Sequence, residues 1–199
     1  MENQNLYWQT LKFVKLAAGD IFLISFVPKE AVKHIRQVGL LSLQELIKDK
    51  KALKLSKPGQ EKKFLKEVLQ RLEDPEWSLF QRGVSAFFTL PDFSAISDKH
   101  FVIKNKLVPV KINISSLLKD KPKTEVHGVE MVPFDASKKS QPKRERILDL
   151  NEIRKMIMKK PSDLWSHYKN PKDKMYAPDV PHAIIVTETG IIPPKYIVS

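Results

Sequence analysis

Five histidines are the residues of this chain with the broadest chemistry, because their side chains change charge near neutral pH. They lie far apart in the sequence, at His34, His100, His127, His167 and His182. No two of them have the short spacing that metal sites use, so the sequence predicts no metal centre. Chemistry is therefore expected at single positions rather than in a histidine cluster.

His182 and Glu188 are the leading candidates for catalysis, because they bracket a short apolar run. That run, Ala183 to Val186, is rich in β-branched residues and predicts a buried central strand. Polar groups at the ends of such strands often face a cleft, so His182 could act on a substrate. Two ordinary explanations stay open: His182 could cap the strand through a hydrogen bond, and Glu188 could be a solvated carboxylate in the turn predicted at Thr189 and Gly190.

A further histidine and two carboxylates occur in the segment EVHGVE, where Glu125 and Glu130 flank His127. The alternation of a β-strand puts Glu130 on the face opposite His127. We therefore expect no acid/base pair in this segment.

The motifs that would identify a common enzyme class are absent from the sequence. There is no phosphate-binding glycine loop, no dinucleotide GxGxxG, no HExxH and no G-x-S-x-G. The absence of cysteine excludes disulfides, thiolate catalysis and cysteine-bound metal, and it agrees with a reducing, cytoplasmic compartment. No apolar run approaches the ~18 residues of a membrane span, and the first residues lack the order of a signal peptide. We expect a cytoplasmic protein without a membrane segment.

Positive charge is the main compositional signal: 35 Lys and Arg against 23 Asp and Glu give a net charge of +12. Such a field attracts nucleic acid or acidic protein surfaces. The densest basic stretch, residues 137–146, contains no apolar residue and is predicted to be a solvated, mobile loop. Its cations are the candidate nucleic-acid-binding residues: Lys138, Lys139, Lys143, Arg144 and Arg146. The alternative is that lysine-rich surfaces only keep the protein in solution.

Hydrophobic periodicity and turn residues predict the elements that must position these side chains. Strands are expected at 21–27, 84–90, 101–103, 107–114, 126–134 and 183–186, and helices or helical turns at 6–18, 28–38, 42–56, 61–72, 92–96, 115–118, 150–158 and 163–168. After the last strand, Pro193 and Pro194 predict an extended path to an aromatic anchor, Tyr196. No repeat or long linker divides the chain. The sequence thus predicts one α+β domain over residues 1–199, with a small mixed or antiparallel sheet, flanking helices and a basic loop at about 137–146.

Three segments together resemble one family. LISFVPKEAVKHIRQVGLLS, residues 23–42, resembles the opening strand and helix of ADP-ribosyltransferase-like domains, and GVSAFFTLPDF, residues 83–93, resembles the second strand of their nicotinamide pocket. AIIV followed by IIPPKYI resembles the last strand and tail of related members, including RNA 2′-phosphotransferases and DNA-targeting ADP-ribosylating toxins. The three segments occur in the family's order along the chain.

The resemblance implies an ADP-ribosyltransferase-like fold that uses NAD to modify a nucleic-acid or protein target. It places Ser25, Ser85 and Phe87 at cofactor-binding positions, with His182 or Glu188 near the catalytic position. The sequence departs from the family twice, since Ser25 stands where a histidine or arginine usually grips the dinucleotide, and no glutamate lies next to His182. Either the site uses different residues, or the scaffold is a basic module that binds nucleic acid or an acidic protein without catalysis. The sequence leaves enzymatic activity and oligomeric state open.

Overall fold

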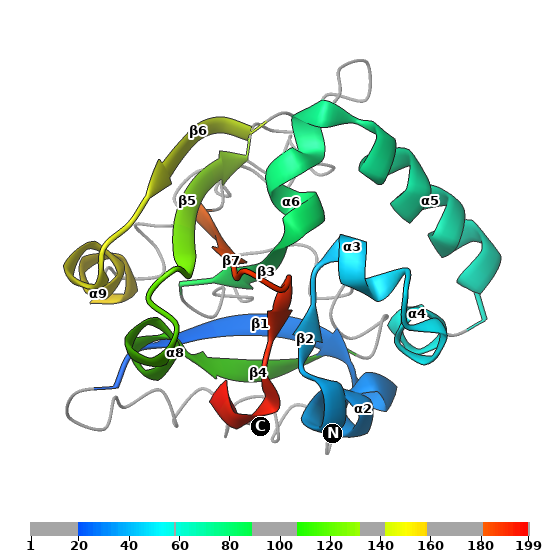
Figure 1. Ribbon diagram of the computed structural model, residues 1–199, viewed down its shortest axis with the longest axis horizontal. Coiled ribbons are helices and arrows are strands. Elements are labelled where there is room, and N and C mark those ends of the chain that lie inside the picture. The colour runs from blue at the N-terminus through cyan, green and yellow to red at the C-terminus, as the bar shows by residue number, and fades with distance from the viewer. Residues whose placement is uncertain (1–19, 58, 89–106, 132–141, 159–180, 199) are drawn as a thin grey trace, which may run out of the picture.

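An antiparallel sheet forms the centre of the computed structural model, which describes residues 20–57, 59–88, 107–131, 142–158 and 181–198 (Figure 1). Its strands are β1 (Phe22–Pro28), β3 (Gly83–Phe87), β4 (Leu107–Asn113), β5 (Glu125–Met131), β6 (Pro142–Ile147), β7 (Pro181–Val186) and β9 (Ile197–Val198). They lie in the order β6-β5-β7-β3-β1-β4-β9, and each neighbouring pair is antiparallel. Two short strands, β2 (Leu40–Leu41) and β8 (Ile191–Ile192), pair with each other separately.

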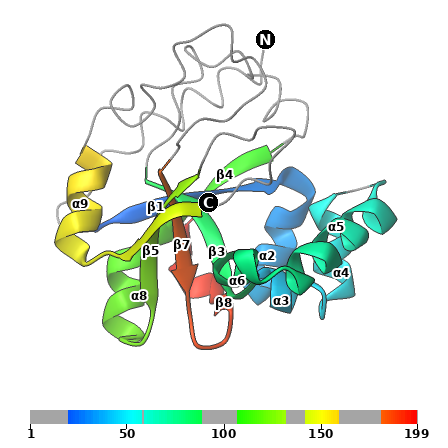
Figure 2. The same ribbon diagram turned by 90° about the horizontal axis from the view of Figure 1, so that it is seen from above.

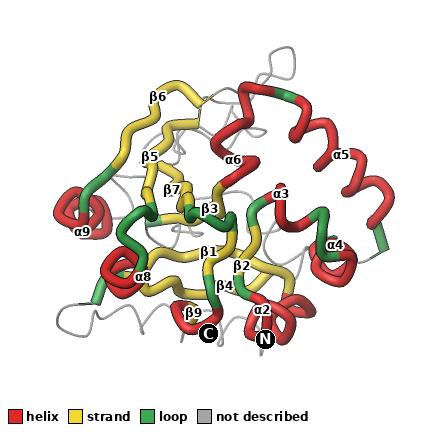
Figure 3. The backbone as a smooth tube through the Cα atoms, viewed as in Figure 1, coloured by secondary structure: helices red, strands yellow, loops and turns green. Residues whose placement is uncertain are grey.

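Helices lie beside the sheet in two groups (Figures 1 and 2). One group contains α8 (Ile114–Asp120) and α9 (Leu150–Met158). The other contains η1 (Lys29–Ala31), α2 (Val32–Val38), α3 (Leu43–Leu46), α4 (Lys50–Ser56), α5 (Glu61–Glu73), η2 (Pro75–Trp77) and α6 (Ser78–Arg82). A last turn, η4 (Pro194–Tyr196), precedes β9. Figure 3 shows the strands between the two groups of helices, and the α+β class expected from the sequence is confirmed.

β7 is the central strand that the sequence predicted, because it lies between β5 and β3 and is buried on both faces. Successive side chains of a strand point to opposite faces. Ile185 accordingly packs into the main core with α8 and α9, while Ile184 packs against Leu79 and Phe80 of α6. Both isoleucines are fully buried.

Two predicted capping boxes are present. The Ser42 side chain accepts a hydrogen bond from the Glu45 N–H, 3.4 Å away, and Asp149 and Glu152 cap each other's N–H groups at 2.8 and 3.1 Å. The helix that begins after Ser42 ends at Leu46, however, instead of continuing to residue 56. Asp49 begins a new helix, because its side chain caps α4.

Two expectations differ from the structure. From Pro142 onward the expected basic loop is a strand, β6, which pairs with β5 along the edge of the sheet. The chain after Pro193 forms a 3-10 turn instead of an extended segment. Tyr196 is nevertheless buried in the core, as predicted. The elements expected at 6–18, 92–96, 101–103 and 163–168, together with Lys138 and Lys139, lie outside the described residues. In the described ranges, no helix is both long and apolar enough to cross a membrane.

Candidate functional site

The site is organised around an opening between strands β1 and β3. β1 pairs with β4 at seven positions, from Phe22 to Pro28, whereas its pairing with β3 within the described residues is limited to Ile24 and Phe87. Beyond that pair, the β3 backbone needs other hydrogen-bond partners. The Ser25 hydroxyl supplies one by donating to the Ser85 carbonyl over 3.0 Å. A side chain thus replaces a ladder hydrogen bond where the two strands diverge.

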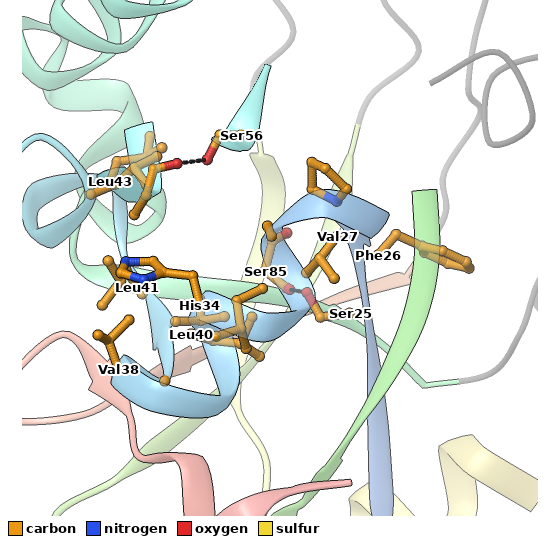
Figure 4. A pocket seen from close by; sticks show the side chains of 18 of the residues that line it. Ser25, Phe26, Val27, His34, Val38, Leu40, Leu41, Leu43, Ser56 and Ser85 are labelled. Atoms are coloured by element: carbon orange, nitrogen blue, oxygen red, sulfur yellow. Dashed lines mark hydrogen bonds between the residues drawn. The ribbon is translucent and has the colours of Figure 1, made fainter. Parts of the chain in front are cut away.

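A cavity of about 440 Å³ lies at this opening (Figure 4). Its walls come from β1, β3, the start of β4, α2, β2 and α3 to α6. Most of the lining side chains are apolar, and its polar members include Ser25, Ser85, Ser56, His34 and Arg71. This size and composition are typical of pockets that bind small molecules.

Aromatic rings and one cation occupy the wall formed by α5, η2 and α6. The Trp77 and Phe80 rings meet edge to face, with their centroids 5.2 Å apart. The Arg71 guanidinium lies over the Trp77 ring, 4.9 Å from its centre. Aromatic faces stack well on planar ligands, and a guanidinium binds phosphate or carboxylate in a bidentate geometry. This wall could therefore hold a planar ring next to an anionic group.

His34 and Asp49 form a hydrogen-bonded pair on another wall of the pocket. His34 comes from α2, and its side chain is only 9% exposed. Its Nε2 lies 2.7 Å from Asp49 Oδ2, while its buried Nδ1 has no hydrogen-bond partner among the described residues. Asp49 Oδ1 accepts the backbone N–H groups of Lys51 and Ala52, each at 2.9 Å.

The Asp49 carboxylate is held in its ionised form. Partial burial opposes ionisation, but hydrogen bonds from the Ala52 N–H and from His34 outweigh it and lower the pKa of Asp49. An ionised carboxylate only accepts hydrogen bonds, so the His34 Nε2 must be the donor. In the neutral ring, Nδ1 then carries a lone pair.

The cofactor-binding residues expected from the sequence lie on adjacent strands but on different faces. Ile24 is opposite Phe87, so these two share a face of the sheet. Ser25, the next residue, points to the other face together with Leu23. Ser85 is exposed and lines the pocket, whereas Phe87 contacts Phe26 through an edge-to-face pair with centroids 5.6 Å apart. The structure therefore does not bring Ser25 and Phe87 together as one contact surface.

The two catalytic candidates lie at opposite ends of β7. His182 is the second residue of the strand, with Phe87 of β3 on one side and Val129 of β5 on the other. Glu188 follows the strand's far end and is exposed, with an Oε1 2.9 Å from the Lys123 Nζ. That hydrogen bond lowers the pKa of Glu188. The arrangement agrees with a solvated turn carboxylate and does not place Glu188 near His182.

The expectation that EVHGVE contains no acid/base pair is wrong for Glu125. Its Oε2 lies 2.8 Å from His127 Nε2, because residues two apart in a strand share a face. The His127 side chain is buried, and the Glu125 side chain is partly exposed. The pair does not line the cavity at the β1 and β3 opening.

The remaining predicted cations gather on one edge of the sheet. Lys143, Arg144 and Arg146 belong to β6, whose partner is β5. Within the part of the chain that the structure describes, no group of three His, Cys, Asp or Glu could hold a metal ion.

The sequence did not identify His34, Asp49 or Arg71 as site residues. Asp49 has a recognisable signal, since an aspartate often caps the helix that follows it. His34 has none, because its partner is 15 positions away on another helix. Comparisons with protein-family models, curated proteins and solved structures found no match.

Proposed function

We propose that this protein is an ADP-ribosyltransferase-like protein that binds NAD in the pocket at the β1 and β3 opening. The observation that carries the proposal is that the three strands bearing the family resemblance are consecutive in the sheet, in the order β7-β3-β1, with the opening between β3 and β1. No described residue of β7 lines the pocket itself. Only one strand separates β1 from β7, so the backbones of Ser25 and His182 lie roughly 10 Å apart at normal strand spacing. Three segments that are distant in the sequence thus come together in one part of the sheet.

The pocket offers groups that complement different parts of a dinucleotide. Trp77 and Phe80 present aromatic surface for a planar ring. Arg71 supplies a cation for a phosphate. His34 adds a polar side chain to the mostly apolar lining. These residues support NAD binding although the family's usual histidine or arginine is replaced by Ser25.

The proposed reaction transfers ADP-ribose from NAD to a nucleic-acid or protein acceptor. The bond between the ribose and nicotinamide breaks, nicotinamide leaves with the bonding electron pair, and the acceptor nucleophile forms the new bond to the ribose. The acceptor's proton passes to a base, and His182 is our candidate for that role. No carboxylate occurs among the described residues that line the pocket. Positioning of NAD against the acceptor would therefore supply much of the acceleration.

Measuring nicotinamide release from NAD, with and without RNA, DNA or protein acceptors, tests this proposal. We expect turnover in the unmodified protein and a loss of at least about tenfold in His182→Ala, equivalent to about 1.4 kcal/mol in barrier. Lys119→Ala on the exposed end of α8 is the control and should keep full turnover. Full turnover in His182→Ala would remove His182 from the site, and a failure of the unmodified protein to bind NAD would refute the proposal.

A second candidate function is a non-catalytic module that binds nucleic acid or an acidic protein. The position of β6 favours it, because this strand contains three cations and lies at the edge of the sheet. Salt-sensitive binding to RNA or DNA without any binding of NAD would support this function over the first.

A further inference from the structure

We infer that Arg71 binds the diphosphate of the ligand in this pocket, and that Gln81 is a positioning residue that holds the part of the chain carrying Arg71. The inference rests on the proposed function, because it assigns one part of NAD to one wall of the pocket. It extends to ADP-ribose, which carries the same diphosphate without nicotinamide.

The cavity contains one permanent charge. Among the described residues that line it, Arg71 is the only lysine or arginine, and none is an aspartate or a glutamate. Ser25 on β1 is uncharged, and its hydroxyl already donates to the Ser85 carbonyl. An otherwise apolar cavity with a single cation on its wall favours an anionic ligand, and a guanidinium matches the oxygen pairs of phosphate groups.

The N–H donors of Arg71 are free to bind such a ligand. The guanidinium lies over the ring of Trp77, which lines the same cavity, so this contact holds the cation at the wall. An aromatic ring attracts a cation but offers no lone pair to its five N–H donors. Among the described residues, no carboxylate forms an ion pair with Arg71. Glu67, one turn earlier on α5, lies instead 3.1 Å from the Lys57 Nζ.

Gln81 of α6 holds the end of the helix that carries Arg71. Its Nε2 donates to the backbone carbonyls of Arg71 and Asp74, each over 2.8 Å. The Trp77 ring is held in turn by its edge-to-face contact with Phe80. Arg71 is therefore fixed at its backbone by Gln81 and at its guanidinium by Trp77. A cation that is already held in place loses less conformational freedom when a ligand binds.

Calorimetric titration with NAD and with ADP-ribose tests this assignment. We expect Arg71→Met to weaken the binding of both ligands by a similar factor of at least about ten, because both lose the same contact. Lys66→Met removes one charge from an exposed position of the same helix that does not line the cavity, and it should keep both affinities.

Arg71→Lys keeps the charge but not the two parallel N–H donors, so it should bind both ligands more weakly than the unmodified protein and more tightly than Arg71→Met. Should Arg71→Met not fold, Arg71→Lys decides alone. Unchanged affinities of Arg71→Lys for both ligands would then overturn the inference.

A double-variant comparison tests the positioning role of Gln81. Gln81→Met keeps the length of the side chain and removes both donors, and we expect it to weaken the binding of both ligands less than Arg71→Met does. Added to Arg71→Met, it should cause no further loss, because Gln81 acts through Arg71. The same loss with and without Arg71 would contradict the positioning role.

The two ligands separate this inference from the function on which it rests. If NAD does not bind but ADP-ribose binds and depends on Arg71, the diphosphate site stands and the proposed function falls. If Arg71→Met binds NAD as tightly as the unmodified protein does, the inference falls and NAD binding stands. A loss confined to NAD would place Arg71 at the nicotinamide end and overturn the inference. Binding of neither ligand to the unmodified protein would refute both.

Discussion

The Asp49 carboxylate holds three groups in place: the Lys51 and Ala52 N–H groups at the start of α4, and the His34 ring on α2. One residue therefore caps a helix, joins two helices and orients a pocket side chain. Its side chain is 28% exposed, so these hydrogen bonds are only partly screened by solvent.

Removing this carboxylate should destabilise the fold in a pH-dependent way. We expect Asp49→Ala to lower the free energy of unfolding at pH 7 by about 1–2 kcal/mol, through the lost cap and the lost His34 partner. Because the pKa of Asp49 is lowered by folding, its contribution is complete above the unfolded value of about 3.9 and disappears as the pH falls through the folded value. Urea unfolding at pH 7 and at about pH 2.5 measures this, and a difference between the proteins that is equally large at both pH values would contradict it.

At the scale of elements, the short strands β2 and β8 pair with each other. This pairing connects the helices of the N-terminal half to the segment that follows β7. Leu40 and Leu41 pair with Ile192 and Ile191, and the Ser42 N–H donates to the Gly190 carbonyl over 2.8 Å. The chain enters β2 through Gly39, which has a φ of 96°. A Cβ at this position would lie 2.2 Å from the Ile192 carbonyl oxygen. Only glycine allows this approach of the two backbones.

Gly39→Ala should be much more destabilising than Gly59→Ala, although both glycines have positive φ. Gly59 has nothing within 4 Å of an added Cβ, so only the conformational cost of about 1–2 kcal/mol applies there. At Gly39 the clash adds to it, giving about 3 kcal/mol in total. Thermal or urea unfolding of the two variants measures the difference. Equal losses would show that β2 and β8 can separate without penalty.

The elements with regular apolar patterns could be predicted from the sequence. The spacing of Phe64, Leu65, Val68 and Leu72 indicated α5, and the apolar run of β7 indicated a central strand. β6 could not be predicted, because a basic edge strand lacks apolar alternation and looks like a loop. The hydrogen-bonded pair of His34 and Asp49 also escaped prediction, since tertiary packing alone brings α2 against the start of α4. The opening between β1 and β3 could not be predicted from the sequence either. It depends on where the pairing of β1 with β3 ends in the folded protein, while the pairing of β1 with β4 continues.

At the scale of the whole molecule, the segment after β8 completes the sheet, because β9 forms the edge opposite β6. Tyr196 is buried, and its hydroxyl donates to Asp120 Oδ2 over 2.9 Å. Lys195 reaches the same carboxylate at 2.9 Å, and this hydrogen bond, together with that of Tyr196, lowers the pKa of Asp120. β9 then pairs with Lys111 and Ile112 of β4.

Two substitutions of Tyr196 should separate its ring from its hydroxyl. We expect Tyr196→Ala to reduce the free energy of unfolding by about 3–5 kcal/mol, because it removes a buried ring. Tyr196→Phe keeps the ring and should cost only about 1 kcal/mol. Urea unfolding measures both values. A loss of less than about 1 kcal/mol in Tyr196→Ala would mean that the docked segment does not stabilise the sheet.

The net charge of +12 also belongs to the whole molecule, and it makes a prediction for the second candidate function. Neutralising Lys138, Lys139, Lys143, Arg144 and Arg146 should weaken nucleic-acid binding and reduce its salt dependence by up to about one unit of slope per lost contact. Neutralising the exposed Lys62, Lys63 and Lys66 of α5 is the control, which alters the net charge at a different surface. Equal effects in both variants would show that the charge acts without a defined binding surface.

Calorimetric titration of the purified protein with NAD tests the central claim most directly. The pocket can be filled without opening the core by Ser85→Trp, since Ser85 is exposed and lines the cavity. Ser78→Trp places the same side chain at an exposed position of α6 that does not itself line the cavity. We predict saturable binding of one NAD per chain to the unmodified protein and to Ser78→Trp, and its loss in Ser85→Trp. No binding to the unmodified protein, or undiminished binding to Ser85→Trp, would contradict the assignment of this pocket to NAD.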